Sequence, residues 1–321
     1  MLPTMPRCSA ILVTYNSSAT IGQCLRALAP QDCEIIVVDN ASRDDTVAQV
    51  RGLSEKVPSQ LITISQNIGF AGGVNQGARA AGGDVLLILN PDAVAEPGAI
   101  NAVVSCLART AASAVGGALI GSDGQPEKGF AFRRLPTLAS LLFEALLINQ
   151  MWPGNAVNRR YRCLDADYSR EQDVEQPAGA CLAVNREAWQ AVQGMDVGFY
   201  PVWFEDVDFC QRLLRSGAKI VYCPDARFHH SGAHSVGQLE FRNRQMFWYR
   251  NMARYADKHL GAVGALVLRL GIFVGMGLRM LASLFGGAPR HVRTGEALRG
   301  YARVALWAMG LGGGSKNTPA D

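Results

Sequence analysis

The sequence lacks several features that would assign it to a common class of protein. None of its eight cysteines forms a Cys-x-x-Cys pair, which argues against a structural zinc site. No Gly-x-Gly-x-x-Gly motif follows the first predicted strand, and no phosphate-binding loop of the Gly-x4-Gly-Lys-Ser/Thr type occurs. The dinucleotide-binding fingerprint and P-loop chemistry are therefore both absent.

Strong charge of either sign is also missing. The net charge is +4 over 321 residues, so nothing in the composition indicates a nucleic-acid partner. The N-terminus carries no long apolar run after a basic start, so we expect no signal peptide and a reducing, cytoplasmic environment. Hydrophobic residues make up 49% of the chain, which predicts a folded globular protein.

The first half alternates short β-rich runs with helical patterns. Two further strands are predicted in the second half, at residues 178–184 and 218–225. This order predicts an α/β fold, with a mainly parallel sheet flanked by helices. In such sheets ligands bind at the carboxyl ends of the strands. The predicted strands are residues 10–16, 34–40, 61–65, 84–90, 178–184 and 218–225.

Polar residues follow several of these strands. In "NPDA" (90–93), Asp92 can hold Mg²⁺ or Mn²⁺ beside substrate phosphates, although Asn-Pro and Pro-Asp also form turns. Asp39 can accept a hydrogen bond from a pyrimidine or a ribose, or it can cap a turn with Asn40. Both interpretations stay open for each motif.

A glycine-rich stretch, "NIGFAGGVNQGARAAGG" (67–83), follows the third predicted strand. Its glycines allow the backbone to approach a ligand closely. Tight packing of a helix against the sheet is the alternative explanation for the same residues.

Three carboxylates lie close together in "FEDVDFCQRL" (204–213), where Glu205, Asp206 and Asp208 fall within four consecutive positions. A helix N-terminus would stabilise them without any chemistry. The neighbouring motifs favour an active site instead, because aromatic residues precede the cluster and "FHHSGAHS" (228–235) follows one strand later. Histidine is a suitable ligand for Mn²⁺.

Together these motifs resemble family 2 glycosyltransferases, and most of all their bacterial rhamnosyltransferase-like branch. The resemblance covers about residues 8–255 and implies a GT-A fold, a nucleotide-binding α/β half joined to an acceptor half. The motifs that carry it, in order, are "ILVTYN", "VVDNAS", "NIGFAGGVNQG", "LNPDA", "PAGACLAV", "FYPVWFEDVDFCQRLLRSG" and "HHSGAHS".

The resemblance implies roles for individual residues. Asp206 matches the catalytic base, and Glu205 would orient the acceptor or the loop while Asp208 caps the helix. Asp92 matches the last Asp of the metal-binding Asp-x-Asp motif, whose first position is Asn90 here. His229 matches a metal-binding histidine, with His230 as its reserve. The residues matching the nucleotide-sugar site are Thr14, Tyr15, Asn16, Asp39, Asn67, Gly69, Phe70, Gly73, Asn75, Asn90 and Asp92.

The implied reaction is an inverting transfer from a nucleoside diphosphate sugar, assisted by Mg²⁺ or Mn²⁺. The cation neutralises the leaving diphosphate, and a carboxylate accepts the proton of the attacking hydroxyl. A position near a helix start should keep Asp206 ionised. By resemblance the donor is dTDP-rhamnose, with a UDP-sugar as the alternative, and the acceptor is a lipid-linked saccharide or polysaccharide of the cell envelope.

The tail differs from the rest of the chain. Residues 260–288 are the most hydrophobic segment, but Arg269 and Arg279 leave no run of about 18 uncharged residues for a membrane span. We expect C-terminal amphipathic helices over 256–321, with a flexible end, lying on the inner face of the plasma membrane with the arginines toward the headgroups. Packing on a catalytic domain over 1–255, or across a homodimer, is the alternative.

Two other classes compete with a transferase. A non-catalytic sugar-nucleotide-binding or scaffold protein of the same fold would explain Asn90, while the retained Asp92, Asp206 and His229 argue against it. A nicotinamide oxidoreductase is opposed by the missing glycine fingerprint.

Overall fold

The computed structural model describes residues 6–232, 237 and 239–311. Within them the chain forms two compact units. The sheet unit comprises residues up to 135 together with 162–201 and the stretch from 205, and the helical unit comprises 136–161, 202–204 and the C-terminal helices. The last part of the histidine motif, residues 233–235, and the predicted flexible end, 312–321, lie outside the described residues.

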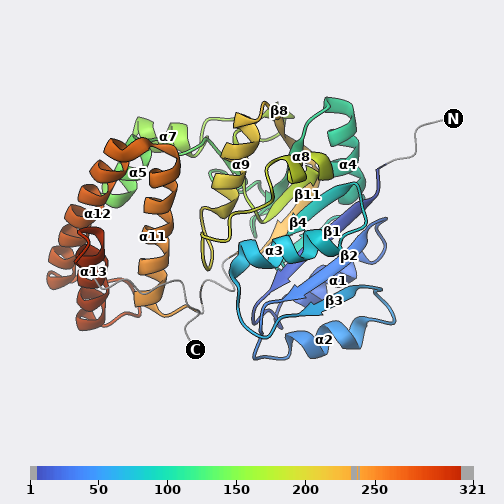
Figure 1. Cartoon of the computed structure of the whole chain (residues 1–321), viewed down its shortest axis with the longest axis horizontal. Coiled ribbons are helices and arrows are strands. Elements are labelled where there is room, and N and C mark those ends of the chain that lie inside the picture. The colour runs from blue at the N-terminus through green and yellow to red at the C-terminus, as the bar shows by residue number, and fades with distance from the viewer. Residues whose placement is uncertain (1–5, 233–236, 238, 312–321) are drawn as a thin grey trace. The chain divides into compact units, whose positions relative to one another are not determined.

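The main sheet is mostly parallel, which confirms the predicted fold class (Figure 1). One strand, β10, runs antiparallel between β4 and β6, and β5 pairs antiparallel with β11. The strands in spatial order are β3 (Gln60–Thr63), β2 (Glu34–Asp39), β1 (Cys8–Thr14), β4 (Val85–Leu89), β10 (Cys181–Asn185), β6 (Ala114–Ile120), β11 (Ile220–His230) and β5 (Ala93–Ala95), with β8 (Gln172–Asp173) paired to β11.

Helices connect many of the strands of this sheet. A second, small sheet pairs β7 (Phe132–Arg133) with β9 (Gln176–Pro177). The strands read as continuous apolar runs because side chains pack on both faces of the sheet. The helices of the sheet unit are α1 (Ile21–Leu28), α2 (Thr46–Leu53), α3 (Gly69–Ala80), α4 (Ala99–Thr110), α8 (Arg186–Ala191) and α9 (Glu205–Arg215).

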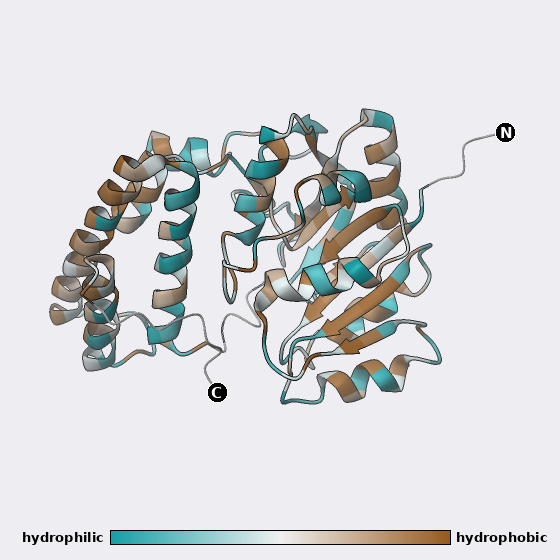
Figure 2. Ribbon diagram, viewed as in Figure 1, coloured by the Kyte–Doolittle hydropathy of each residue, from teal (hydrophilic) through white to brown (hydrophobic). Residues whose placement is uncertain are grey.

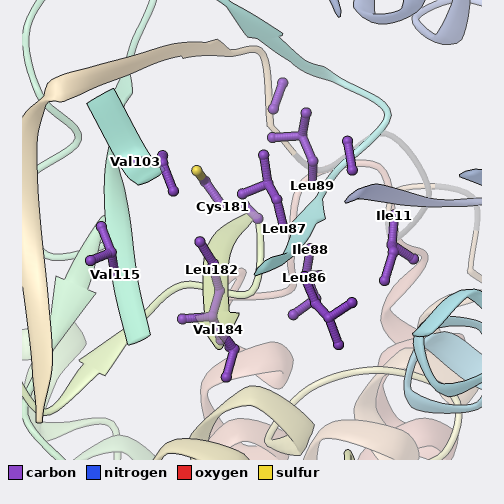
Figure 3. Packing of buried hydrophobic residues seen from close by; sticks show 14 of the residues in the cluster. Ile11, Leu86, Leu87, Ile88, Leu89, Val103, Val115, Cys181, Leu182 and Val184 are labelled. Atoms are coloured by element: carbon purple, nitrogen blue, oxygen red, sulfur yellow. The ribbon is translucent and has the colours of Figure 1, made fainter. Parts of the chain in front are cut away.

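The core of the sheet unit lies along its central strands. Leu87 and Leu89 of β4, Val115 of β6 and Leu182 of β10 are fully buried, and Val103 of α4 packs with them (Figure 3). This packing fixes the carboxyl ends of β1, β2 and β4, so the polar residues that follow those strands stand on a rigid platform.

Strand β6 has no counterpart among the predicted strands. Its sequence, "AVGGALI", contains Gly116 and Gly117, which weaken a strand pattern. Both glycines are required by close neighbours: a Cβ at Gly116 would lie 2.4 Å from Pro177, and one at Gly117 would lie 2.7 Å from the Cys181 sulfur. Contacts distant in sequence therefore determine this strand.

The helical unit begins earlier than the sequence suggests. The expected division after Tyr255 falls inside α11 (Phe241–His259), and residues 136–161 join the C-terminal helices. Helix α12 (Gly261–Leu284) packs against α11, α13 (Thr294–Ala308) and α5 (Leu138–Ala145). The short helices α6 (Ile148–Met151) and α7 (Ala156–Tyr161) complete the unit.

Helix α12 presents two different faces. Its buried side carries glycines that let α5 approach, since a Cβ at Gly271 would lie 2.4 Å from Leu142. Its other side is exposed and apolar, and Figure 2 shows most of the helix in the hydrophobic colour. Of the helices described, α12 is the one long and apolar enough to cross a membrane. Its exposed apolar residues, here called the α12 apolar face, are Val263, Leu266, Val267, Leu270, Phe273, Val274, Leu278, Leu281 and Leu284.

The arginines of α12 do not point as expected. Arg279 is 7% exposed and turned into the helical unit, and Arg269 pairs with Asp257 at 2.7 Å and stacks over Trp307. The expectation that both would reach lipid headgroups is therefore wrong for Arg279 and stays a prediction for Arg269, whose side chain is partly exposed. Arg269 thus has a carboxylate partner, whereas the buried Arg279 is held by backbone carbonyls.

Candidate active site

Asp206 lies in the first turn of α9, at the junction with the small sheet. Its Oδ2 accepts hydrogen bonds from the Gly179 amide at 2.9 Å and the Gln176 side-chain amide at 3.2 Å. Its Oδ1 accepts one from the Val207 amide at 2.8 Å. The carboxylate is thus held in one orientation while its residue stays partly exposed. A carboxylate fixed in this way on a partly exposed residue suits the role of a general base.

Burial raises the pKa of Asp206 above 3.8, although its backbone hydrogen bonds and the charge of Arg133 act in the opposite direction. The amides at the helix start, such as that of Val207, lower this pKa in the expected direction, but burial outweighs them. A carboxyl with a raised pKa binds a proton more strongly than an ordinary Asp does. That change improves a general base, since its pKa moves toward the pH at which it works.

The two neighbouring carboxylates have different surroundings. Glu205 is 4% exposed, and its Oε2 has no hydrogen-bond partner among the described residues. Burial and the charge of Asp206 both raise the pKa of Glu205 well above its usual range. Asp208 is fully buried and pairs with Arg212 at 2.8 Å, which is an ion pair between residues one turn apart on the helix.

The carboxyl ends of β1 and β2 form a connected polar edge. The Thr14 hydroxyl donates to Asp39 Oδ1 at 2.9 Å, and Asp39 Oδ2 accepts from the Ser42 amide at 3.0 Å. Thr14 is fully buried, so it orients Asp39 and does not itself face solvent. Tyr15 and Asn16 are the partly exposed residues at this edge, and Asn16 Oδ1 accepts from the Arg43 amide at 2.8 Å.

The glycine-rich stretch divides into two parts. In the first, the Asn40 side chain bonds Asn67 Oδ1 at 2.9 Å and the Gly69 carbonyl at 3.2 Å. Gly69 has φ +79°, and the Phe70 amide donates to the Pro201 carbonyl at 2.7 Å. These contacts place the start of α3 beside the loop that leads to α9 and Asp206.

The second part of the stretch packs the helix. A Cβ at Gly73 would lie 2.6 Å from the Val13 side chain, so the alternative interpretation, close packing on β1, accounts for this glycine. Asn75 bonds the backbone of Met195 in both directions, at 2.8 and 2.9 Å. The side chain of Asn75 is thus engaged by the protein itself, where the family resemblance implies a nucleotide-sugar contact.

His230, and not His229, lies beside Asp92. Adjacent strand residues point to opposite faces, so the two side chains separate. His230 Nε2 is 3.7 Å from Asp92 Oδ1, and its Nδ1 is 3.0 Å from Glu127 Oε2. His229 is 54% exposed at its side chain and lies 2.8 Å from Glu96. The structure therefore favours the reserve histidine over His229 as the partner of Asp92.

The pair formed by Asp92 and His230 fits a divalent cation. A separation of 3.7 Å is too long for a hydrogen bond, and Nε2 has no hydrogen-bond partner in the described part of the chain. If Nδ1–H donates to the Glu127 carboxylate, Nε2 carries a lone pair that faces another carboxylate. A cation with bonds of about 2.1 Å to each atom would relieve that repulsion. No cluster of three or more His, Cys, Asp or Glu ligands occurs among the described residues.

A short backbone path connects this pair with the carboxylate of α9. Gly179 donates to Asp206, and the next residue, Ala180, accepts from the Asn90 amide at 3.0 Å. Asn90 precedes Asp92 by two positions. A proton acceptor and a candidate cation pair therefore occupy one end of the sheet unit.

Three supporting residues were missed by sequence reasoning, because Gln176, Gly179 and Glu127 were not singled out. The "PAGACLAV" motif contained a signal for Gly179, since a glycine before a buried strand allows close approach. Nothing in the sequence indicated Glu127, which is 103 positions from the histidine that it contacts.

The mostly parallel sheet flanked by helices, with polar residues at its strand ends, has the GT-A fold. The profile of Glycosyl transferase family 2 matches residues 9–163. This match and the relatives below support a family 2 glycosyltransferase with a rhamnosyltransferase-like sequence.

One relative and two solved structures illustrate the match. N-acetylglucosaminyl-diphospho-decaprenol L-rhamnosyltransferase of Mycobacterium tuberculosis is 27% identical over 267 residues, or 78% of this chain and 84% of that protein. Mannosyltransferase PcManGT from Pyrobaculum calidifontis, solved with GDP-Man and Mn²⁺, has a TM-score of 0.56 and 17% identity, covering 94% of this chain and 87% of that one. S. aureus TarS 1-349 has a TM-score of 0.52 and 15% identity, covering 95% and 92%.

Proposed function

We propose that this glycosyltransferase moves L-rhamnose from dTDP-rhamnose to a hydroxyl of a lipid-linked acceptor in cell-envelope glycan synthesis, with inversion at the anomeric carbon. The observation that carries the reaction type is Asp206, fixed by three hydrogen bonds yet partly exposed. The relative from Mycobacterium tuberculosis, which transfers L-rhamnose to a decaprenol-linked acceptor by its name, supports the donor and the acceptor class.

Asp206 would act as the base. It accepts the proton of the acceptor hydroxyl while the hydroxyl oxygen attacks the anomeric carbon and the bond to the diphosphate breaks. Gly179 and Gln176 would hold the carboxylate in the orientation that the transfer needs. A single displacement with one base inverts the anomeric centre. Asp39, whose carboxylate is oriented by the Thr14 hydroxyl, would hold the nucleoside.

Asp92 and His230 would hold Mg²⁺ or Mn²⁺, and the Mn²⁺ in the PcManGT structure supports this assignment. When bound, the cation neutralises charge on the leaving diphosphate. Glu127 would fix the tautomer of His230 by accepting a hydrogen bond from its Nδ1–H, which would leave Nε2 available to the cation. Asn90 supplies no charge, so the donor's diphosphate would provide part of the cation's ligand set.

The donor assignment is tested by incubating the protein with dTDP-rhamnose, UDP-glucose, UDP-N-acetylglucosamine and GDP-mannose. Each reaction contains Mn²⁺ and a polyprenyl diphosphate N-acetylglucosamine acceptor, and released nucleoside diphosphate is measured. We expect release to be fastest with dTDP-rhamnose and to require the acceptor. Faster turnover of a UDP-sugar would replace the donor, and no turnover with any donor would favour the non-catalytic alternative.

We also propose that the α12 apolar face holds the protein on the cytoplasmic surface of the plasma membrane. The face is continuous and carries no charged residue, and a surface of this kind is costly in water. A lipid-linked acceptor would be presented at the same surface. A homodimer that buries this face is the competing explanation.

Placing a charge on the face should release the protein. Because Phe273 and Val274 are 45% and 51% exposed, we expect the double change Phe273→Glu and Val274→Glu to lower liposome binding at least tenfold without unfolding the protein. The measurement is co-sedimentation with liposomes that contain anionic lipid. Val197→Glu is the matched control, because Val197 is 58% exposed in the sheet unit.

Two results would contradict the membrane assignment. One is unchanged sedimentation of the double variant. The other is a full-length protein that ignores liposomes at low salt and runs as a dimer, with the double variant running as a monomer.

A further inference from the structure

The helical unit contains a cavity of about 570 Å³ that the proposed chemistry does not use. Two guanidinium groups, Arg244 of α11 and Arg279 of α12, line it together with aromatic side chains. Among its lining residues the single carboxylate is Glu144, whose Oε2 accepts from the Asn149 amide at 3.2 Å. The cavity is therefore positively charged, and its aromatic lining comprises Trp203, Phe241, Trp248, Tyr249 and Tyr301.

Arg279 is a buried cation without a counter-ion. Its guanidinium donates to the backbone carbonyls of Ala145, Gly275 and Glu144, and it lies 5.6 Å from the ring centroid of Tyr249. No carboxylate of the described residues comes within ion-pair distance of it. Carbonyl dipoles compensate such a charge only in part, so the site would be more stable with an anion present.

Arg244 lines the same cavity as Arg279. It is partly exposed, and none of the described carboxylates pairs with it. The charges of Arg279 and Arg244 both lower the pKa of Tyr301, although burial is the larger effect and raises it. The two guanidinium groups and the tyrosine hydroxyl therefore meet within electrostatic reach, and all three can donate to phosphate oxygens.

Exposed apolar residues adjoin this polar cavity along the chain. Gln150 lines it, and the next two residues, Met151 and Trp152, are 83% and 65% exposed. Ala282 lines it on α12, followed closely by Leu284 and Phe285, which are 62% and 84% exposed. A ligand that fits both features has an anionic head and an apolar chain.

We infer that this cavity binds the diphosphate of the isoprenoid-linked acceptor, with the isoprenoid chain passing along the exposed apolar residues beside it. The inference rests on the proposed function for the identity of the acceptor. It adds a binding site for the acceptor's lipid carrier, separate from the residues that carry the reaction.

The test measures binding of farnesyl diphosphate to the full-length protein by calorimetry, without nucleotide sugar and in EDTA, so that no metal holds the diphosphate. We expect farnesyl diphosphate to bind at least tenfold more tightly than either inorganic pyrophosphate or farnesol. Arg244→Gln should weaken the binding about 10- to 100-fold, the range for a lost charge-assisted hydrogen bond.

Arg242→Gln is the matched control. Arg242 lies two residues earlier on α11 and is exposed, and it does not line the cavity, so its loss should leave the affinity unchanged. Arg279→Gln would remove the buried cation, but it also removes the bonds to α5, so the partly exposed Arg244 gives the cleaner variant.

Three results would overturn the inference. They are equal affinity of Arg244→Gln and the unchanged protein, equal affinity for pyrophosphate and farnesyl diphosphate, and equally effective displacement of farnesyl diphosphate by phosphatidylglycerol. The second result would indicate a free-phosphate site, and the third a headgroup site. Failure of the proposed function has a different signature: no donor is consumed, while farnesyl diphosphate still binds in an Arg244-dependent way.

Discussion

Asp206→Asn is expected to lower the rate of sugar transfer by at least about 10²- to 10⁴-fold while leaving nucleotide binding within a few-fold. The amide keeps the shape of the carboxylate but cannot accept the proton of the acceptor hydroxyl. Turnover is measured as released nucleoside diphosphate, and binding by calorimetry. Asp225→Asn is the control, since Asp225 is an exposed carboxylate on β11 and should not affect turnover.

The melting temperature of the variant distinguishes a loss of catalysis from a loss of folding. The folded-state pKa of Asp206 is raised, so the folded protein binds the proton more tightly than the unfolded chain does. The carboxylate therefore destabilises the fold increasingly as the pH rises through the window between the two pKa values. Asp206→Asn removes this penalty, which offsets the one hydrogen bond that its NH2 group cannot accept, so its melting temperature at neutral pH should fall by at most a few degrees.

The same pKa shift predicts a pH dependence of the unchanged enzyme. Its rate should decline with falling pH at values above those at which an ordinary Asp becomes protonated, because Asp206 is active only without its proton. Two results would show that Asp206 is not the base. One is an Asp206→Asn variant that retains most of its turnover, and the other is a variant whose rate declines at low pH in the same way as that of the unchanged enzyme.

His230→Ala and Asp92→Ala are each expected to weaken Mn²⁺-dependent binding of dTDP or UDP by at least about tenfold. Both side chains are buried and face each other across 3.7 Å, so each would supply one ligand to the same ion. Calorimetry with Mn²⁺ and with EDTA isolates the metal-dependent part of the affinity.

His229→Ala serves as the control for this pair. Its side chain is half exposed and lies beside Glu96, so its removal should leave the metal-dependent affinity intact. Full transferase activity in excess EDTA would contradict the cation site altogether. If His229→Ala weakens the metal-dependent affinity and His230→Ala does not, the metal ligand is His229, as the family resemblance implies.

Much of the sheet unit could be predicted from the sequence, because local signals agree with the final fold. Strands β1, β2 and β4 are uninterrupted apolar runs with polar residues at their carboxyl ends, and that pattern is sufficient to predict a parallel sheet and its ligand edge. Strand β6 escaped prediction because two glycines, required by contacts with Pro177 and Cys181, interrupt its pattern.

Individual roles within the site were decided by tertiary structure. The motif "FHH" could not distinguish His229 from His230, since one register position on β11 determines which ring faces Asp92. In the same way, three carboxylates adjacent in sequence received different surroundings: Glu205 was buried without a partner for its Oε2, Asp206 was hydrogen-bonded yet accessible, and Asp208 was paired with Arg212.

The sequence by itself determined the fold class, the family resemblance and the segments that carry the candidate carboxylates and histidines, since these depend on apolar periodicity and on motifs read along the chain. Tertiary structure decided which side chains meet, as with Arg279, which was expected at a membrane surface and lies inside a cavity. The physical reason is that a side chain's direction and solvation depend on neighbours more than a hundred positions away, such as Ala145 for Arg279.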